Sequence, residues 1–342
     1  MSSHFKISFA TFVIFLAYNQ VQAEEASFCF DRMMASVLSD NAKLGRQYLL
    51  ADPQKGQVRE SNQTRIHIGT NRKAAVIVHG YAGSPFEVDS VAEDFQHLGY
   101  TTIQPLISGF GSSENVANLS NSTQWQESLA NAVDTVAPCV ESVTLVGFSL
   151  GGALVTDFVF SNPNISREGE YQSASGALAQ IEKIVLASPF YRIHGHVPHI
   201  LLDLIQSMTE SVDSRKLYER TKINDLRAFY LFPDYYSVQM PLSAARHVVE
   251  YGQDLIQRTK GKSEIPILLA YSESDLTVDV EFAQKFVIEH FEHSQKFVFP
   301  RDLQLPHQFL IPAFNPQLNL FLDEMKDFLR GDSKAIIPDV HL

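Results

Sequence analysis

The sequence is poor in several features that define other classes of protein. Its 342 residues include two cysteines and one tryptophan, with no internal repeat and no low-complexity tract. Two cysteines exclude a multi-disulfide scaffold and leave at most one bridge, Cys29 to Cys139. An oxidising compartment would favour that bridge, although sequence does not give its geometry. Stability must therefore come chiefly from a hydrophobic core, for which a content of 45% hydrophobic residues is ample.

Basic residues are scarce relative to acidic ones. The chain has 27 Lys and Arg against 39 Asp and Glu, a formal net charge of −12. Binding to nucleic acid or to an anionic membrane surface relies on basic patches. The composition therefore argues against nucleic acid as a partner, and we attribute the acidity to solubility.

The N-terminus has an apolar run that is too short to cross a bilayer. It covers Ile7 to Tyr18, 12 residues, whereas a spanning helix needs about 20. With Lys6 before it and "VQA" ending at Ala23, the layout is that of a secretory signal peptide. We expect residues 1–23 to be cleaved on export to the periplasm or medium; the alternative is an uncleaved anchor. The segment carries one lysine and no acid, so the mature chain of 319 residues has a formal charge of −13. We expect no integral membrane span in that mature chain.

Short apolar runs alternate with segments of helical periodicity from residue 74 onward. Strands are predicted at residues 74–80, 100–106, 142–148, 181–189, 265–275 and 295–300. Helices are predicted at residues 84–99, 122–138, 150–160, 278–291 and 316–330. This alternation predicts an α/β fold with a mostly parallel central sheet and helices on both faces.

One segment interrupts the alternation. Residues 191–263 have helical patterning and an aromatic cluster, Phe229 to Tyr236, but no clear buried strand. We expect an inserted helical cap over the strand ends, with residues 24–190 and 264–342 forming the core. The alternative is a structural subdomain that does not contact substrate.

The stretch from Gly147 to Gly151 reads G-F-S-L-G and lies between a predicted strand and a predicted helix. In that context, G-x-S-x-G indicates a serine on a sharp turn, with small neighbours that prevent clashes. Ser149 would stand at the positive end of the following helix, which stabilises a developing oxyanion. We therefore predict that Ser149 is a nucleophile; the alternative is a tight turn that serves helix packing.

A serine hydroxyl needs a base, and the base needs an orienting acid. His307 follows the last predicted strand and is our candidate base, whereas we place His290 and His293 on the surface and His247 in a cap helix.

The candidate acid is Asp275, at the end of the strand that begins at Ile265. Asp279, which resembles a helix N-cap, and Glu273 are the alternatives. Backbone N–H groups of Leu150 and Tyr81 are the expected oxyanion-hole donors, because Leu150 follows the serine and Tyr81 lies in the loop after residues 74–80.

These motifs resemble the α/β-hydrolase superfamily, in its capped carboxylesterase and monoacylglycerol-lipase-like branch with a serine aminopeptidase-type domain. The segments that carry the resemblance are VIVHGYAGSP, GYTTIQPLISGFGSS, TQWQESL, LVGFSLGG, AYSESDLTVD and PHQF. The resemblance implies Ser149 as nucleophile, Asp275 as acid and His307 as base, with Tyr81 and Leu150 N–H groups as the hole. It also implies a small ester or lipid substrate and no metal or cofactor. Phe110 stands where relatives often carry histidine, a departure that we expect to change loop packing.

Three other interpretations remain open. His194, His196 and His199 form H-x-H-x-x-H, which would suit zinc, although no H-E-x-x-H occurs. A non-catalytic binding protein of the same fold is the second, and a serine peptidase or amidase is the third.

Overall fold

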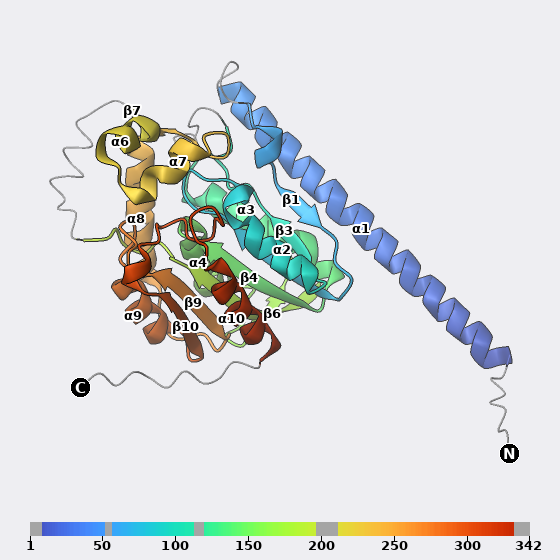
Figure 1. Ribbon diagram of the computed structural model, residues 1–342. Helices are drawn as coiled ribbons and strands as arrows, with labels where there is room; N and C mark the ends of the chain where they lie inside the picture. Colours follow the sequence, from blue (N-terminus) through green and yellow to red (C-terminus); the bar gives the residue numbers. More distant parts are fainter. Residues whose placement is uncertain (1–8, 52–56, 113–119, 196–210, 332–342) are drawn as a thin grey trace, which may run out of the picture.

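Strands and helices alternate along the chain and form a sheet with helices on both sides (Figure 1). The computed structural model describes residues 9–51, 57–112, 120–195 and 211–331. The strands are β1 (Arg65–His67), β2 (Lys73–Val78), β3 (Thr101–Gln104), β4 (Ser142–Phe148), β5 (Glu170–Gln172), β6 (Leu178–Ala187), β7 (Ser211–Asp213), β8 (Gln239–Pro241), β9 (Ile267–Ser272) and β10 (Ser294–Phe299).

The helices include short 3₁₀ turns, labelled η. They are α1 (Phe9–Ala51), η1 (Glu60–Asn62), η2 (Pro85–Val88), α2 (Asp89–His97), α3 (Ser122–Val136), η4 (Ala137–Cys139), α4 (Leu150–Ser161), α6 (Ser214–Thr221), η5 (Asn224–Leu226), α7 (Arg227–Leu231), α8 (Leu242–Arg258), α9 (Val280–His290), η6 (Arg301–Leu303) and α10 (Leu318–Arg330). Every strand and helix predicted from residue 74 onward is present.

The main sheet is mostly parallel, as predicted. Its order is β1-β3-β2-β4-β6-β9-β10, with β5 paired to β6. In this order β1 and β5 run antiparallel to their neighbours, and the other pairs are parallel. Along the chain, β3 is added on one side of β2 and β4 is then added on the other side. In open α/β sheets such a reversal marks the carboxyl edge where ligands bind.

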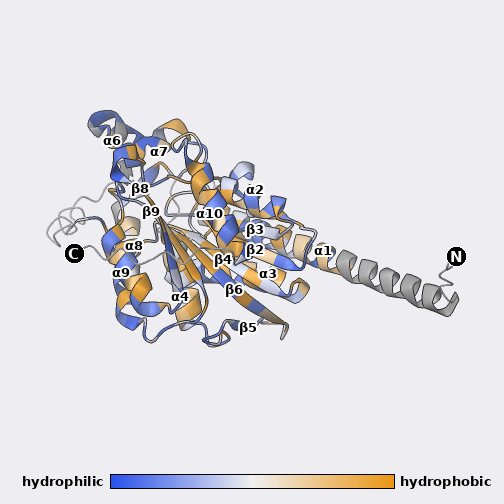
Figure 2. Cartoon of the chain, turned by 60° about the horizontal axis from the view of Figure 1, so that its bottom comes forward, coloured by the Kyte–Doolittle hydropathy of each residue, from blue (hydrophilic) through white to orange (hydrophobic). Residues whose placement is uncertain are grey.

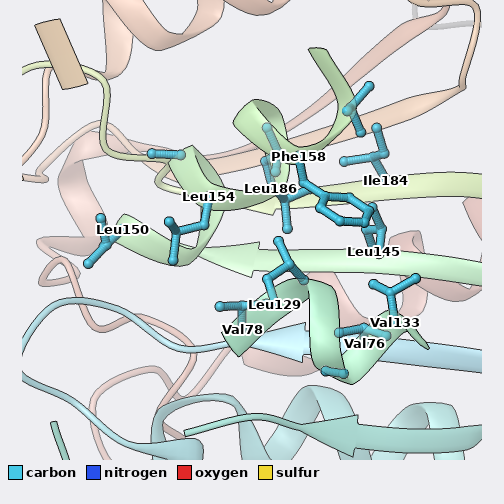
Figure 3. Close-up of a cluster of buried hydrophobic side chains, with 14 of the residues drawn as sticks. Val76, Val78, Leu129, Val133, Leu145, Leu150, Leu154, Phe158, Ile184 and Leu186 are labelled. Atoms are coloured by element: carbon cyan, nitrogen blue, oxygen red, sulfur yellow. The ribbon is translucent and has the colours of Figure 1, made fainter. Parts of the chain in front are cut away.

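Both faces of the sheet are buried, which explains the unbroken apolar runs. Successive side chains of a strand point to opposite faces, so Val76 and Val78 pack with α3 and α4, as Figure 3 shows. Ala75 and Ile77 pack in a second cluster with α2 and α10. Figure 2 shows hydrophobic residues concentrated on the central strands, with polar residues on the outer sides of the helices.

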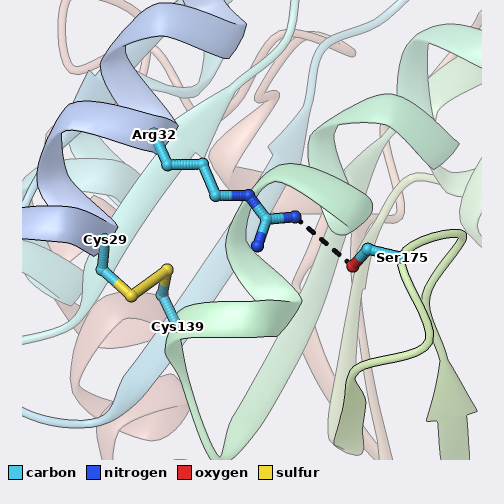
Figure 4. The surroundings of a disulfide bond; sticks show 4 residues. All are labelled: Cys29, Arg32, Cys139 and Ser175. Carbon is cyan, nitrogen blue, oxygen red and sulfur yellow. Dashed lines mark hydrogen bonds between the residues drawn. A yellow bond between two sulfur atoms is a disulfide. The ribbon is translucent and has the colours of Figure 1, made fainter. Parts of the chain in front are cut away.

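The N-terminal part of the chain contains elements that the sequence pattern did not predict. Helix α1 runs from Phe9 to Ala51, and β1 follows it at the edge of the sheet. The cysteines form the expected disulfide, Cys29 to Cys139, with Cα atoms 5.6 Å apart (Figure 4). Within the described ranges, no helix combines the length and apolarity needed to cross a membrane.

The described part of residues 191–263 is helical, with a small two-stranded ribbon. Strands β7 and β8 pair antiparallel; each is so short that it leaves no alternating pattern in the sequence. Figure 1 places α6 and α7 together at one end of the molecule. This segment contacts the core where the Ser237 N–H donates to the Ala82 carbonyl at 2.8 Å. Phe229 and Tyr236 share a buried cluster with Ala82.

Candidate active site

Ser149 occupies a strained backbone turn between β4 and α4. Its dihedral angles are φ 54° and ψ −118°, a region that residues other than glycine enter at a cost of about 1–3 kcal/mol. Surrounding hydrogen bonds hold it there. The Ser149 N–H donates to the Ala187 carbonyl at 3.0 Å, and its own carbonyl accepts from the Phe190 N–H at 2.9 Å. The sharp turn expected from the sequence is therefore present.

The glycines on either side of Ser149 are required by space. A Cβ on Gly147 would lie 2.4 Å from the Gly151 carbonyl oxygen, and a Cβ on Gly151 would lie 2.3 Å from the Val78 carbonyl oxygen. Both contacts are with backbone, so neither can be relieved by a side-chain rotation. The G-x-S-x-G pattern is thus explained by the close approach of α4 to β2 and β4.

His307 and Asp275 form a buried pair. The His307 Nδ1–H donates to Asp275 Oδ2 at 2.7 Å, and both side chains are almost wholly excluded from solvent. Asp275 Oδ1 accepts from the N–H groups of Thr277 and Val278 at 2.9 and 3.0 Å. Among the described residues, His307 Nε2 has no hydrogen-bond partner although it is buried. The ring lies 5.0 Å, centroid to centroid, from that of Phe148, the residue before Ser149.

The charges around this pair shift both pKa values. Burial alone would lower the pKa of His307, but the charges of nearby carboxylates, Asp275 first, and the hydrogen bond to Asp275 raise it above the ordinary value. Burial would likewise raise the pKa of Asp275, but His307 and the surrounding hydrogen bonds hold it below the ordinary value. The geometry thus favours an ionised Asp275 that orients and stabilises a proton-accepting imidazole.

Tyr81 and Leu150 follow the ends of two neighbouring strands, β2 and β4. Val78 of β2 pairs with Gly147 of β4, so the loop after β2 adjoins the start of α4. The loop after β2 approaches Ser149 itself, because a Cβ on Gly80 would lie 3.0 Å from Ser149 Cβ. The loop that bears Tyr81 therefore lies next to Ser149 and the start of α4 at Leu150.

The alternative acids have other partners. Asp279 caps α9, accepting from the Phe282 N–H at 2.9 Å, and it pairs with Arg192, which confirms the predicted N-cap. Glu273 accepts from the Arg301 N–H at 3.0 Å. Of these three acids, Asp275 is the one that contacts His307.

The other histidines are separate from this pair. His290 is half-buried, not fully on the surface as expected, because its ring packs against Phe286 with centroids 4.5 Å apart; its Nδ1 lies 3.0 Å from the Gly261 carbonyl. His247 lies in α8 and His293 just after α9, as expected. The His194 N–H donates to the Thr277 carbonyl at 3.0 Å, whereas His196 and His199 lie outside the described residues.

Asp225 is a buried residue of the site that the sequence analysis missed. It comes from η5, in the inserted segment, and only 4% of it is exposed. Its Oδ1 accepts from the His307 N–H at 3.0 Å. Its Oδ2 accepts from the Leu276 N–H at 3.0 Å and the Thr277 hydroxyl at 2.8 Å. One carboxylate thus joins the loops of the candidate acid and base. No local pattern signals a contact between residues so distant in sequence.

Glu87 was also missed, because no motif in the segment around it marks a buried acid. It is 2% exposed, and its Oε2 accepts from the Gly80 N–H at 2.8 Å. Burial raises the pKa of Glu87 to about 7, with the nearby Tyr236 hydroxyl and Gly80 N–H acting in the opposite direction. Glu87 thereby fixes the backbone directly before Tyr81.

Known proteins share both sequence and fold with this chain. Residues 69–299 match the family described as serine aminopeptidase, S33. A thermostable monoacylglycerol lipase from Bacillus sp. (strain H-257) is 24% identical over 90 residues, which make up 26% of this chain and 36% of that enzyme. The chain therefore spans about a third of the length of this curated relative.

Solved structures show the same fold at low sequence identity. A metagenome-derived lipolytic enzyme matches with a TM-score of 0.56 at 17% identity, covering 80% of this chain and 100% of its own. The monoacylglycerol lipase of Paleococcus ferrophilus matches with a TM-score of 0.57 at 14% identity, covering 79% and 98%. A bromoperoxidase from Bacillus anthracis matches with a TM-score of 0.56 at 18% identity, covering 78% and 94%. The chain belongs to the family described as serine aminopeptidase, S33, and has the α/β-hydrolase fold.

Proposed function

We propose that this protein is a serine hydrolase that cleaves carboxylic esters, either short- to medium-chain acyl esters or monoacylglycerol-like lipids. The observation that carries the proposal is the buried His307–Asp275 hydrogen bond of 2.7 Å, which leaves His307 Nε2 available beside the strand end that bears Ser149. Ionised Asp275 holds the imidazole in the tautomer that can accept a proton at Nε2.

The proposed mechanism is acyl transfer in two halves. Ser149 Oγ attacks the ester carbonyl carbon while its proton passes to His307 Nε2, and the N–H groups of Leu150 and Tyr81 stabilise the oxyanion. His307 then protonates the leaving alcohol oxygen as the ester C–O bond breaks. Water, activated by the same imidazole, hydrolyses the acyl-enzyme and restores Ser149. No metal or cofactor is required by this sequence of steps.

We assign residues 191–263 to a cap over the site. The assignment is supported by the contacts of Asp225 with both candidate loops and by the aromatic side chains around Ala82. Phe86 of the core stacks on Tyr235 at 4.0 Å and lies 5.2 Å from Phe232, measured between ring centroids. Apolar, aromatic side chains at this contact suit an acyl chain better than a charged peptide.

A substrate panel tests the proposal against its closest rival, a serine peptidase or amidase, which the family description favours. We expect p-nitrophenyl esters of increasing chain length to be hydrolysed, with a fluorophosphonate probe labelling Ser149. Aminoacyl anilides should be poor substrates. Faster cleavage of the anilides would favour the peptidase, and absence of both labelling and turnover would favour a non-catalytic binding protein.

The pH profile should depend on Asp225. His307 must be neutral to accept a proton, so kcat/KM should rise with pH through the pKa of His307. Because the carboxylates of Asp275, Asp225 and Glu87 raise that pKa, the rise should centre above the ordinary value of 6.5. Asp225→Asn removes one negative charge, so the midpoint should move to lower pH, by up to about one unit.

Glu273→Gln is the matched control for this measurement, because Glu273 lies in the loop after β9 that Asp225 contacts, but its carboxylate accepts from the Arg301 N–H instead of contacting His307. It should leave the midpoint unchanged. A midpoint that stays in place in Asp225→Asn, or that moves equally in both variants, would contradict the assigned electrostatic role.

Export with cleavage after Ala23 is also a proposal. Its support is the layout of residues 1–23 and the disulfide between Cys29 and Cys139, which persists in oxidising compartments. Mass spectrometry of protein recovered from the periplasm or medium should give a mature chain that begins at Glu24. Recovery of the full-length chain in membranes would contradict cleavage.

A further inference from the structure

The segment before residue 69 lies outside the matched family region, yet it is attached firmly to the core. The disulfide joins α1 to η4, and Arg32 donates to the Ser175 hydroxyl at 3.3 Å (Figure 4). Met33 and Val37 are buried in the main hydrophobic cluster. We call residues 29–67, of which 52–56 are not described, the N-terminal brace.

The brace contacts the loop of residues 107–112 through its backbone, where the Arg59 N–H donates to the Gly111 carbonyl at 3.2 Å, and through two side chains. Tyr48, 2% exposed, accepts a hydrogen bond from the Gly109 N–H through its hydroxyl. Asn62, fully buried, donates through Nδ2 to the Gly111 carbonyl at 3.2 Å. Gly109 and Gly111 both have left-handed backbone, with φ of 94° and 84°. The loop of residues 107–112 belongs to no helix or strand, so its position depends on contacts with other parts of the chain.

The loop of residues 107–112 in turn packs against the candidate oxyanion loop. The Phe110 ring lies edge-to-face with Tyr81, with centroids 5.3 Å apart. The Ile107 N–H donates to His79 Nε2 at 3.0 Å, and His79 Nδ1 lies 2.8 Å from the Gly80 carbonyl. Burial lowers the pKa of His79 to about 4, so the ring stays neutral and makes one bond as acceptor and one as donor.

The brace also contacts the inserted segment. Asn62 Nδ2 donates to the Asp234 carbonyl at 2.9 Å, and the Arg59 guanidinium donates to the Pro233 carbonyl at 2.9 Å. A few residues later, Ser237 N–H is bonded to the Ala82 carbonyl. The brace thus contacts both segments that pack against residues 80–82, namely the loop of residues 107–112 and the inserted segment at residues 233–237.

From these contacts we infer that Tyr48 and Asn62 are positioning residues, which hold the Tyr81 N–H in place for the oxyanion through the loop of residues 107–112. This inference rests on the proposed function. Oxyanion stabilisation depends on donors fixed within hydrogen-bond distance of the developing charge, and a small displacement lowers the rate without changing ground-state binding.

Tyr48→Phe tests the inference, because it removes only the hydroxyl acceptor and keeps the ring in the core. On a p-nitrophenyl ester, kcat should fall about 10-fold with KM nearly unchanged. The inhibition constant of a trifluoromethyl ketone, whose adduct with the serine mimics the oxyanion, should rise in parallel. Asn62→Ala should act in the same direction. The pH midpoint should not move, since the groups around His307 are untouched.

Ser36→Ala is the matched control. Ser36 lies on the same helix and shares a hydrogen bond of 2.8 Å with the Thr135 hydroxyl, on the α3 side. It should leave kcat and the inhibition constant unchanged. If Tyr48→Phe lowered only the melting temperature, or if both variants lowered kcat equally, the brace would be a purely structural element and the inference would fail.

Amide hydrogen exchange separates this inference from the proposed function. In Tyr48→Phe, but not in Ser36→Ala, exchange of the amides of residues 79–83 and 107–112 should become faster. Exchange rates do not depend on turnover, so this measurement tests the positioning role even if the wild-type protein hydrolyses no ester. Unchanged exchange in those two segments would overturn the positioning role whatever the activity.

Discussion

Replacement of Ser149 by alanine is expected to lower kcat by about 10⁴- to 10⁶-fold, because the acyl-enzyme cannot form without the hydroxyl. Alanine keeps the Cβ and the left-handed backbone at φ 54°, so the fold should survive. We expect steady-state assays on p-nitrophenyl esters to show this loss, fluorophosphonate labelling to disappear, and the melting temperature to stay within a few degrees of wild type.

Ser149→Gly is an informative companion to this variant. It should be equally inactive, but glycine adopts this backbone without strain, so it should be more stable than Ser149→Ala by roughly 1 kcal/mol. Denaturant unfolding of the two variants measures this difference. A Ser149→Ala variant that kept a tenth of the wild-type rate would remove Ser149 from the mechanism, whatever its stability.

The elements around Ser149 could be predicted because their signals are local. The run from Val143 to Val146 consists of apolar or β-branched residues because β4 is buried on both faces. Gly147 and Gly151 are required by contacts within a few residues or with the neighbouring strand. Such constraints leave a pattern in a short window of sequence. The same holds for Asp279, whose capping of α9 depends on the next three residues.

Asp225 and Glu87 could not be identified in this way. Asp225 contacts residues about 50 and 82 positions away, and its neighbours carry no motif. Glu87 lies in a segment with helical periodicity and no motif, yet its side chain is buried next to the Tyr236 hydroxyl of the inserted segment. Both positions are defined by tertiary packing, which single-sequence patterns do not encode.

The N-terminal brace illustrates a further limit. The cysteine count allowed the bridge between Cys29 and Cys139, but nothing in the sequence placed Tyr48 beside Gly109. The sequence does predict a change in loop packing at Phe110, because the resemblance favours histidine at this position. In the structure Phe110 is fully buried between Tyr81 and Trp125.

Replacement of Asp275 by asparagine should lower kcat by about 10⁴-fold, the size of loss expected when the base is held in the wrong tautomer. The asparagine oxygen can keep the bonds from the Thr277 and Val278 N–H groups, now made to Asp275 Oδ1 at 2.9 and 3.0 Å. Its NH₂ group would then face His307 Nδ1 as a donor. Nδ1 would become the acceptor, and Nε2 would carry the proton and be unable to take one from Ser149.

Asp279→Asn is the control for this change, four residues along the same loop. Asparagine is as good an N-cap as aspartate, so α9 should persist and kcat should stay within a few-fold of wild type. If Asp275→Asn kept more than a tenth of the wild-type kcat while Asp279→Asn lost activity, the acid would be Asp279. In that case the His307 ring would have to leave Asp275 during turnover. The 2.7 Å bond that now joins them would then belong to a resting state, because the catalytic arrangement would need a different orientation of the imidazole.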